Sequence, residues 1–63
     1  MKRKGLVKHL LGNGCVFIRE GANHSVFFNP ALRRISTVPR HNEINNLLAK
    51  KICKDLGITY FIK

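Results

Sequence analysis

Acidic residues are almost absent from this 63-residue chain, which contains Glu20, Glu43 and Asp55 but twelve lysines and arginines. Mg²⁺ sites for phosphoryl transfer are built from carboxylates, so the lack of an acidic cluster argues against a metal-dependent nuclease, and no cofactor is expected. The only two cysteines, Cys15 and Cys53, form no CxxC motif, which argues against zinc-binding and thioredoxin-like sites. We expect them to be small buried hydrophobic residues in a reducing compartment.

Long apolar runs are also missing. No segment approaches the roughly 20 apolar residues of a transmembrane helix, so no membrane partner is expected. Residues 1–4 are charged like the start of a signal peptide, but Lys8 interrupts the apolar segment that follows, and no cleavage site ends it. These features predict a cytoplasmic protein.

The chain is long enough for one domain, spanning residues 1–63, but its core is too small to enclose a deep pocket. A functional site should therefore lie at the surface. The formal charge is +9, and the basic residues are spread along the whole sequence. A polyanion is the natural partner of such a chain, through phosphate contacts and counterion release. The alternative is a soluble basic protein with no polyanionic partner.

The order of expected elements is helix, three strands, helix. Three runs rich in β-branched and aromatic residues, each bounded by turn formers, predict strands, and apolar residues at helical spacing flank them. The first expected element is a helix over 2–11 that ends at a left-handed Gly12. Strands are expected over 15–19, 24–29 and 34–38. The last helix is expected to start at the N-cap Asn42, to carry Glu43 in its first turn and to end at Gly57. Residues 58–63 would be a frayed tail or a short extra strand.

This order predicts an α+β fold in which two helices cover one face of a three-stranded antiparallel sheet, as in the double-stranded-RNA-binding domain. Both faces of the sheet would then be apolar, although the helices can cover only one. We expect the covered face to contain Cys15, Phe17, Phe27 and Val38. The open face would contain Val16, Ile18, Val26, Phe28 and Ile35, with His24 beside them, and would form a docking site for a partner protein.

The link between the first two strands carries the most distinctive chemistry. Gly21 and Asn23 tolerate positive φ, so residues 19–24 can form a hairpin loop that places His24 at the start of the second strand. Histidine can take or give a proton near neutral pH. From the residues alone, His24 could equally be a strand-end histidine with no role.

The chain contains four short motifs: GANH at 21–24, NP at 29–30, VPRH at 38–41 and KICKDLG at 51–57. Together, with this spacing and in a basic chain of this length, they resemble the HicA (YcfA-like) family of toxin ribonucleases. The resemblance implies a small messenger-RNA endonuclease with a double-stranded-RNA-binding-like fold that is held inactive by a HicB-type antitoxin. It places the family's loop glycine at Gly21 and its active histidine at His24. Ala22 stands where many members have serine.

Cleavage of RNA needs a base near the 2′-hydroxyl, an acid near the leaving oxygen and a cation near the phosphate. Together with the resemblance, this chemistry predicts an RNA endonuclease in which His24 is the single active-site histidine. Further RNA contacts are expected from Gly21, Asn23, Arg33, Arg34 and Arg40. His41 is a candidate acid or phosphate ligand, although a role in the strand-to-helix connection is favoured.

Two other classes compete with this interpretation. One is a non-catalytic double-stranded-RNA-binding module, which normally needs lysines at the start of its last helix, whereas here the first lysine after Asn42 is Lys50. The other is a basic structural protein of a ribonucleoprotein particle, which has no need of the element at 21–24.

Overall fold

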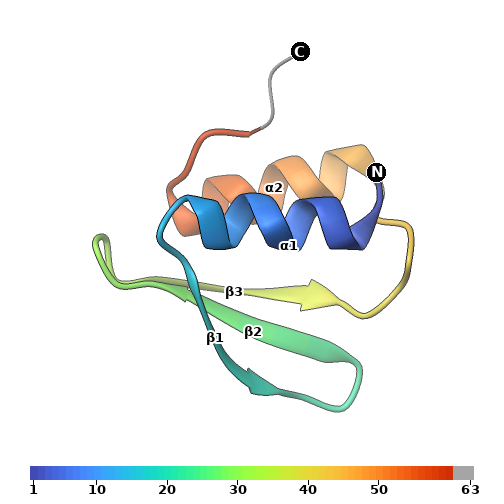
Figure 1. Ribbon diagram of the computed structural model, residues 1–63, viewed down its shortest axis with the longest axis horizontal. Coiled ribbons are helices and arrows are strands. Elements are labelled where there is room, and N and C mark those ends of the chain that lie inside the picture. Colours follow the sequence, from blue (N-terminus) through green and yellow to red (C-terminus); the bar gives the residue numbers. More distant parts are fainter. Residues whose placement is uncertain (61–63) are drawn as a thin grey trace.

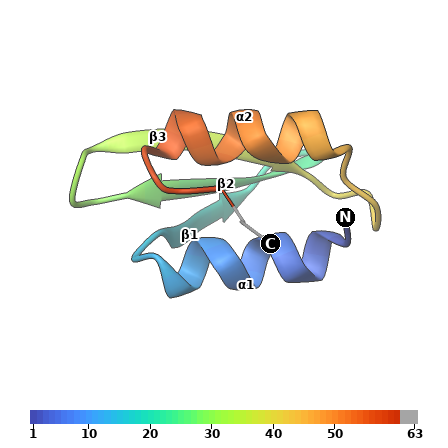
Figure 2. The same ribbon diagram turned by 90° about the horizontal axis from the view of Figure 1, so that it is seen from above.

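The predicted order of elements is confirmed in a computed structural model, which describes residues 1–60 (Figure 1). The elements are α1 (Arg3–Gly12), β1 (Val16–Glu20), β2 (His24–Asn29), β3 (Arg34–Pro39) and α2 (Asn46–Leu56). The strands form an antiparallel sheet in the order β1-β2-β3, so each pairs with its neighbour in sequence. Both helices lie over the same face of the sheet and run roughly parallel to each other (Figure 2).

The core lies between the helices and the sheet. Leu6 and Leu10 of α1 are fully buried, as are Ala49 and Leu56 of α2, because their helical spacing aims each pair at the sheet. The remaining members of this cluster are Cys15, Phe27, Val38, Ile44, Ile52 and Cys53. Its small size leaves the strands to present much of their apolar surface to solvent.

The prediction for the cysteines is confirmed as far as packing is concerned, because Cys15 and Cys53 are both free and buried. Burial raises the pKa of each thiol, and the second thiol nearby raises the pKa of Cys53 further. Both groups therefore stay protonated at neutral pH and act as hydrophobic side chains.

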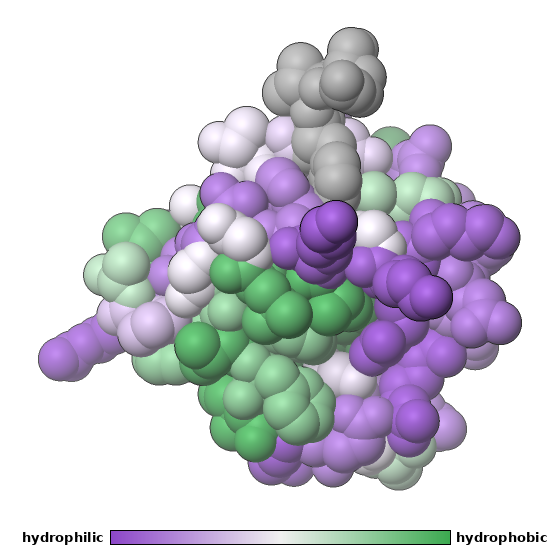
Figure 3. Space-filling model, in the orientation of Figure 1, coloured by the Kyte–Doolittle hydropathy of each residue, from purple (hydrophilic) through white to green (hydrophobic). Residues whose placement is uncertain are grey.

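The assignment of sheet faces holds, with one exception. Cys15, Phe27 and Val38 lie in the core beneath the helices, as expected. Phe17 shares that face and packs edge-on against Phe27, with ring centroids 5.8 Å apart, but it remains 52% exposed. The reason is that β1 is an edge strand that neither helix fully covers; apolar surface gathers over it in Figure 3.

On the opposite face, Val16, Phe28 and Ile35 form one cross-strand row. Val16 and Ile18 are each 45% exposed and Ile35 is 59% exposed, as expected for an uncovered face. Val26 is only 7% exposed, because it lies in the central strand between neighbours on both sides. A bulge between Phe17 and Arg19 adds one residue to β1, so Arg19 lies across from Val26.

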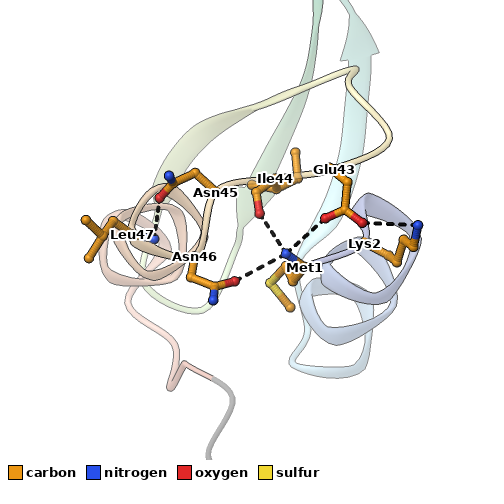
Figure 4. Close-up of polar contacts among 7 residues, drawn as sticks. All are labelled: Met1, Lys2, Glu43, Ile44, Asn45, Asn46 and Leu47. Carbon is orange, nitrogen blue, oxygen red and sulfur yellow. Dashed lines mark hydrogen bonds and ion pairs between the residues drawn. The ribbon is translucent and has the colours of Figure 1, made fainter.

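The start of the last helix differs from the prediction. Asn45 is the N-cap, and its side chain accepts a hydrogen bond of 2.7 Å from the Leu47 N–H (Figure 4). The predicted cap, Asn42, lies three residues before it. The intervening chain is held by α1: the Arg3 N–H donates to the Asn42 carbonyl and the Ile44 N–H donates to the Met1 carbonyl, each at 2.8 Å. These tertiary hydrogen bonds replace the first helical turn that the sequence pattern suggests.

Glu43 consequently lies outside the helix instead of in its first turn. Its carboxylate lies 3.1 Å from the Lys2 ammonium and 3.3 Å from the Met1 ammonium (Figure 4). Lys2, followed by the Met1 ammonium, holds the pKa of Glu43 below its ordinary value. The same ammonium group of Met1 also donates to the Ile44 carbonyl at 2.9 Å.

The turns correct two further expectations. Gly12 is still part of α1, and the positive φ of 89° belongs to Gly14. Gly57 does close α2 in the left-handed conformation, with φ 74°, and a Cβ there would collide with the Leu32 side chain. Arg33 also has a positive φ, 56°, which is uncommon for a residue other than glycine.

The tail predicted at 58–63 is described as far as Tyr60, and residues 61–63 lie outside the described part. Ile58 and Tyr60 pack against the core, and the Thr59 carbonyl lies 2.6 Å from His9 Nε2. Residues 58–60 are therefore docked beside α1, and they form neither a strand nor a frayed end.

The helix cap gives a direct test of this structure. Asn45→Ala should lower the free energy of unfolding by about 0.5–2 kcal/mol, because it removes the N-cap acceptor. Asn42→Ala is the matched control and should have little effect, since Asn42 contributes its backbone carbonyl, which alanine keeps. Urea denaturation of both variants measures this, and equal losses would contradict the observed helix start.

Candidate active site

The predicted active-site residue His24 lies at one end of the sheet. It is the first residue of β2 and pairs with Pro39, the last residue of β3. The β1–β2 link, the end of β3 and the first turns of both helices meet at this end, on the right of Figure 1. An open hollow of ≈ 420 Å³ is present there, lined by Asn23, His24, Pro39, Arg40 and His41.

A tight hairpin holds His24 in place. The Gly21 N–H donates a hydrogen bond of 2.6 Å to the His24 carbonyl, and the Arg40 N–H donates one of 3.3 Å to the Asn23 carbonyl. The hairpin was expected, but the role of its glycine is different. Neither Gly21 nor Asn23 has a positive φ. Instead, a Cβ on Gly21 would lie 3.2 Å from the His24 carbonyl oxygen, so a larger residue would push against the backbone of His24.

A chain of hydrogen bonds connects the hollow to α1. Glu20 Oε2 lies 2.8 Å from Arg40 Nε, and the Ser25 hydroxyl donates to Glu20 Oε1 at 2.8 Å. Arg3 Nη2 donates to Ser25 Oγ at 2.6 Å, and Arg3 Nε donates to the Pro39 carbonyl at 2.8 Å. The guanidinium of Arg40, a residue that lines the same hollow as His24, is thereby held by a carboxylate that is itself hydrogen-bonded.

Arg3, Glu20 and Ser25 also belong to this region, although the sequence did not predict them as part of it. Cross-strand pairing of Glu20 with Ser25 and of Ser25 with Val38 puts both side chains on the helix-covered face, where Arg3 can reach them. One feature of the sequence could have indicated Glu20, because it is the only carboxylate close in sequence to the hairpin.

Arg33 and Arg34 lie at the other end of the sheet. Arg34 pairs with Asn29 at the last step of the β2–β3 ladder, five residues from His24, which corresponds to about 17 Å. Arg34 Nη1 also donates to the Lys54 carbonyl at 3.2 Å, near the end of α2. The structure therefore brings Gly21, Asn23 and Arg40 to His24, whereas the two arginines stand apart from it.

His41 joins the hollow, although a role in the strand-to-helix connection was favoured for it. It is exposed, and α2 starts only at Asn46, so His41 lies well before the helix cap. Across residues 1–60, no group of three or more His, Cys, Asp or Glu side chains is arranged to hold a metal ion. In the same part of the chain, no helix has the length and apolar character needed to span a bilayer.

The element order, the antiparallel sheet and the two helices on one face place the chain in the double-stranded-RNA-binding-domain-like class of folds. Residues 3–58 match the family model described as the HicA toxin of bacterial toxin-antitoxin, so the chain belongs to the HicA toxin family. It is accordingly the toxin component of a toxin–antitoxin module. No curated protein and no solved structure matches it.

Proposed function

We propose that this toxin is a metal-independent RNA endonuclease in which His24 is the general base. The observation that carries the proposal is the position of His24, which is exposed in an open hollow that Arg40 also lines. Membership of the HicA family and the formal charge of +9 support RNA as the substrate.

The reaction uses the nucleophile that RNA itself carries. His24 takes the proton from a 2′-hydroxyl, the 2′-oxygen attacks the adjacent phosphorus, and the bond from phosphorus to the 5′-oxygen breaks as that oxygen takes up a proton. The products are a 2′,3′-cyclic phosphate and a 5′-hydroxyl end. A positioned general base typically accelerates such a step by about 10²–10⁴-fold.

Arg40 would stabilise the charge that develops on the phosphate oxygens. Its Nε–H is occupied by Glu20, but a guanidinium has five N–H donors, so the remaining ones can bind a phosphate. Because Glu20 and the backbone bond to Asn23 already fix Arg40, little reorganisation is needed when RNA binds.

The substitution His24→Ala should lower the rate of RNA cleavage in EDTA by about 10²–10⁴-fold, because it removes the base. The fold should survive, since the side chain is exposed. The matched control His9→Gln replaces a histidine of α1 that does not line the hollow, and it should cleave like the wild type. Cleavage that requires Mg²⁺, or that survives His24→Ala, would contradict the mechanism. Binding without any cleavage would favour the non-catalytic alternative.

Arg33 and Arg34 would bind the RNA backbone away from the cleaved bond. The conformation of Arg33 supports this role, because a non-glycine residue with φ 56° costs on the order of 1–3 kcal/mol, and glycine would avoid that cost. A strained arginine at an exposed turn in a basic protein is explained if its charge contacts phosphate.

Arg33→Gly should therefore change stability and RNA binding in opposite directions. We expect the free energy of unfolding to rise by up to about 1 kcal/mol through relief of backbone strain. The dependence of log K on log salt concentration should weaken by about one unit, and Arg34→Gln should act similarly on binding. Lys50→Gln on α2 is the charge-matched control and should leave the salt dependence close to that of the wild type. An unchanged slope in Arg33→Gly would place the RNA elsewhere.

A HicB-type antitoxin is the proposed protein partner, and the open face of the sheet is its proposed docking surface. Val16, Ile18 and Ile35 expose about half of their side-chain surface there, on the face that His24 shares by strand alternation. Apolar surface of this kind commonly marks an interaction site. A partner bound to this face would cover these residues and would at the same time block access to His24.

Ile35→Lys tests this surface. Loss of an interface hot spot costs about 2 kcal/mol or more, so Kd for the antitoxin should rise by about 30-fold. Ile35 is 59% exposed, so the fold should tolerate the change; Val26, at 7%, would mainly report on folding. Leu47→Lys on α2, where the side chain is 76% exposed, is the control and should bind normally in titration calorimetry. Equal effects in both variants would exclude the open face as the interface.

A further inference from the structure

The geometry points to His41 as a second catalytic residue, the general acid that protonates the leaving 5′-oxygen. This inference rests on the proposed RNA cleavage and assigns the proton transfer that His24 alone leaves open. In an in-line displacement the attacking 2′-oxygen and the leaving 5′-oxygen lie on opposite sides of the phosphorus. A single imidazole cannot face both oxygens at once, so a second proton donor on the far side of the phosphate accelerates the reaction.

The position of His41 follows from the sheet register. His24 pairs with Pro39, and the Arg40 N–H continues the ladder by donating to the Asn23 carbonyl at 3.3 Å. His41 follows Arg40 directly, so it lies one residue beyond the last backbone bond that joins this segment to the hairpin carrying His24. Both histidines are lining residues of the same hollow, and Arg40, which also lines it, precedes His41 in sequence.

The segment that carries His41 is anchored on both sides. Before it, the Pro39 carbonyl accepts a hydrogen bond from Arg3 Nε at 2.8 Å. After it, the Asn42 carbonyl accepts one from the Arg3 N–H, also at 2.8 Å. These bonds fix the backbone on either side of His41 before any substrate arrives, as a positioned catalytic group requires.

A purely structural role for His41 finds no support in its contacts. Within residues 1–60 its ring makes no hydrogen bond to the protein, and the side chain is exposed. The cap of α2 is formed by Asn45, so His41 does not stabilise the helix start. A fixed backbone with an exposed imidazole at the edge of the hollow suits a group whose partner is the substrate.

The protons balance over the step. The 2′-hydroxyl proton passes to His24 as the bond from the 2′-oxygen to phosphorus forms. The proton of a His41 imidazolium passes to the 5′-oxygen as the bond from phosphorus to that oxygen breaks. His24 ends protonated and His41 neutral, and exchange with water restores both.

The test uses two short RNAs that differ at one atom. In the second RNA, sulfur replaces the 5′-bridging oxygen at the bond that the wild type cleaves. A thiolate, whose conjugate acid has a pKa of about 8.5, leaves without a proton, so this substrate needs no general acid. His41→Gln should cleave the ordinary RNA about 10²–10⁴-fold more slowly than the wild type and should cleave the sulfur-bridged RNA at close to the wild-type rate. His24→Ala should be slow on both, because the 2′-hydroxyl still needs its base.

The outcomes separate this inference from the proposed function. If His41→Gln matches the wild type on the ordinary RNA, or stays slow on the sulfur-bridged RNA, His41 is not the acid, while cleavage by His24 stands. If the wild type cleaves neither RNA, the proposed function itself fails and the His41 role fails with it. If His41→Gln is slow on the ordinary RNA and cleaves the sulfur-bridged RNA at close to the wild-type rate, His41 is the general acid.

Discussion

The hydrogen bonds of Arg3 hold together the end of the molecule where the candidate site lies. The guanidinium of this first residue of α1 reaches the Pro39 carbonyl at the end of β3 and the Ser25 hydroxyl in β2, and its backbone N–H reaches Asn42. Hydrogen bonds that involve a charged group contribute about 1.5–3 kcal/mol each, so this residue matters in a domain with a small core. Through Ser25 and Glu20 the same chain continues to Arg40.

The small size of the core determines where function can reside. Two short helices bury one face of the sheet, and the other face and the outer strand β1 remain exposed with apolar residues on them. This arrangement supplies the two surfaces that the proposed function uses: a hollow lined by His24, Arg40 and His41 at one end of the sheet, and an apolar face proposed for contact with the antitoxin. His24 lines the hollow and shares the apolar face by strand alternation, so the proposed docking of a partner on that face would also limit access to His24.

Much of the fold was predictable because its signals are local. The β-branched runs fixed three strands to within a residue, and strand alternation identified the face beneath the helices. The start of α2 was not predictable, since Asn42 and Asn45 are both good cap residues and hydrogen bonds from α1 to residues 42–44 decide between them. The half-exposed Phe17 likewise depends on how far the helices extend over β1.

The candidate site was predictable in part. The hairpin pattern and the family motif indicated His24 and Gly21, and the same hairpin pattern indicated Asn23. The contacts of Arg3 with Ser25 and Pro39 join residues 22 and 36 positions apart, and no local pattern reports them. The pairing of His24 with Pro39 brings His41 to the hollow, and predicting it requires the register of the β2–β3 ladder. That register is hard to predict because the turn between those strands contains an arginine in a conformation that usually favours glycine.

Removal of the 2′-hydroxyl from the RNA tests the proposed mechanism most directly. In EDTA, the protein should cleave a short RNA to a 2′,3′-cyclic phosphate and a 5′-hydroxyl end, as mass spectrometry of the products would show. The same RNA with a single 2′-deoxynucleotide on the 5′ side of that bond should bind with similar affinity and stay intact there, because the attacking oxygen is gone. Cleavage of the deoxy-substituted bond would contradict the central claim that His24 activates the 2′-hydroxyl of RNA.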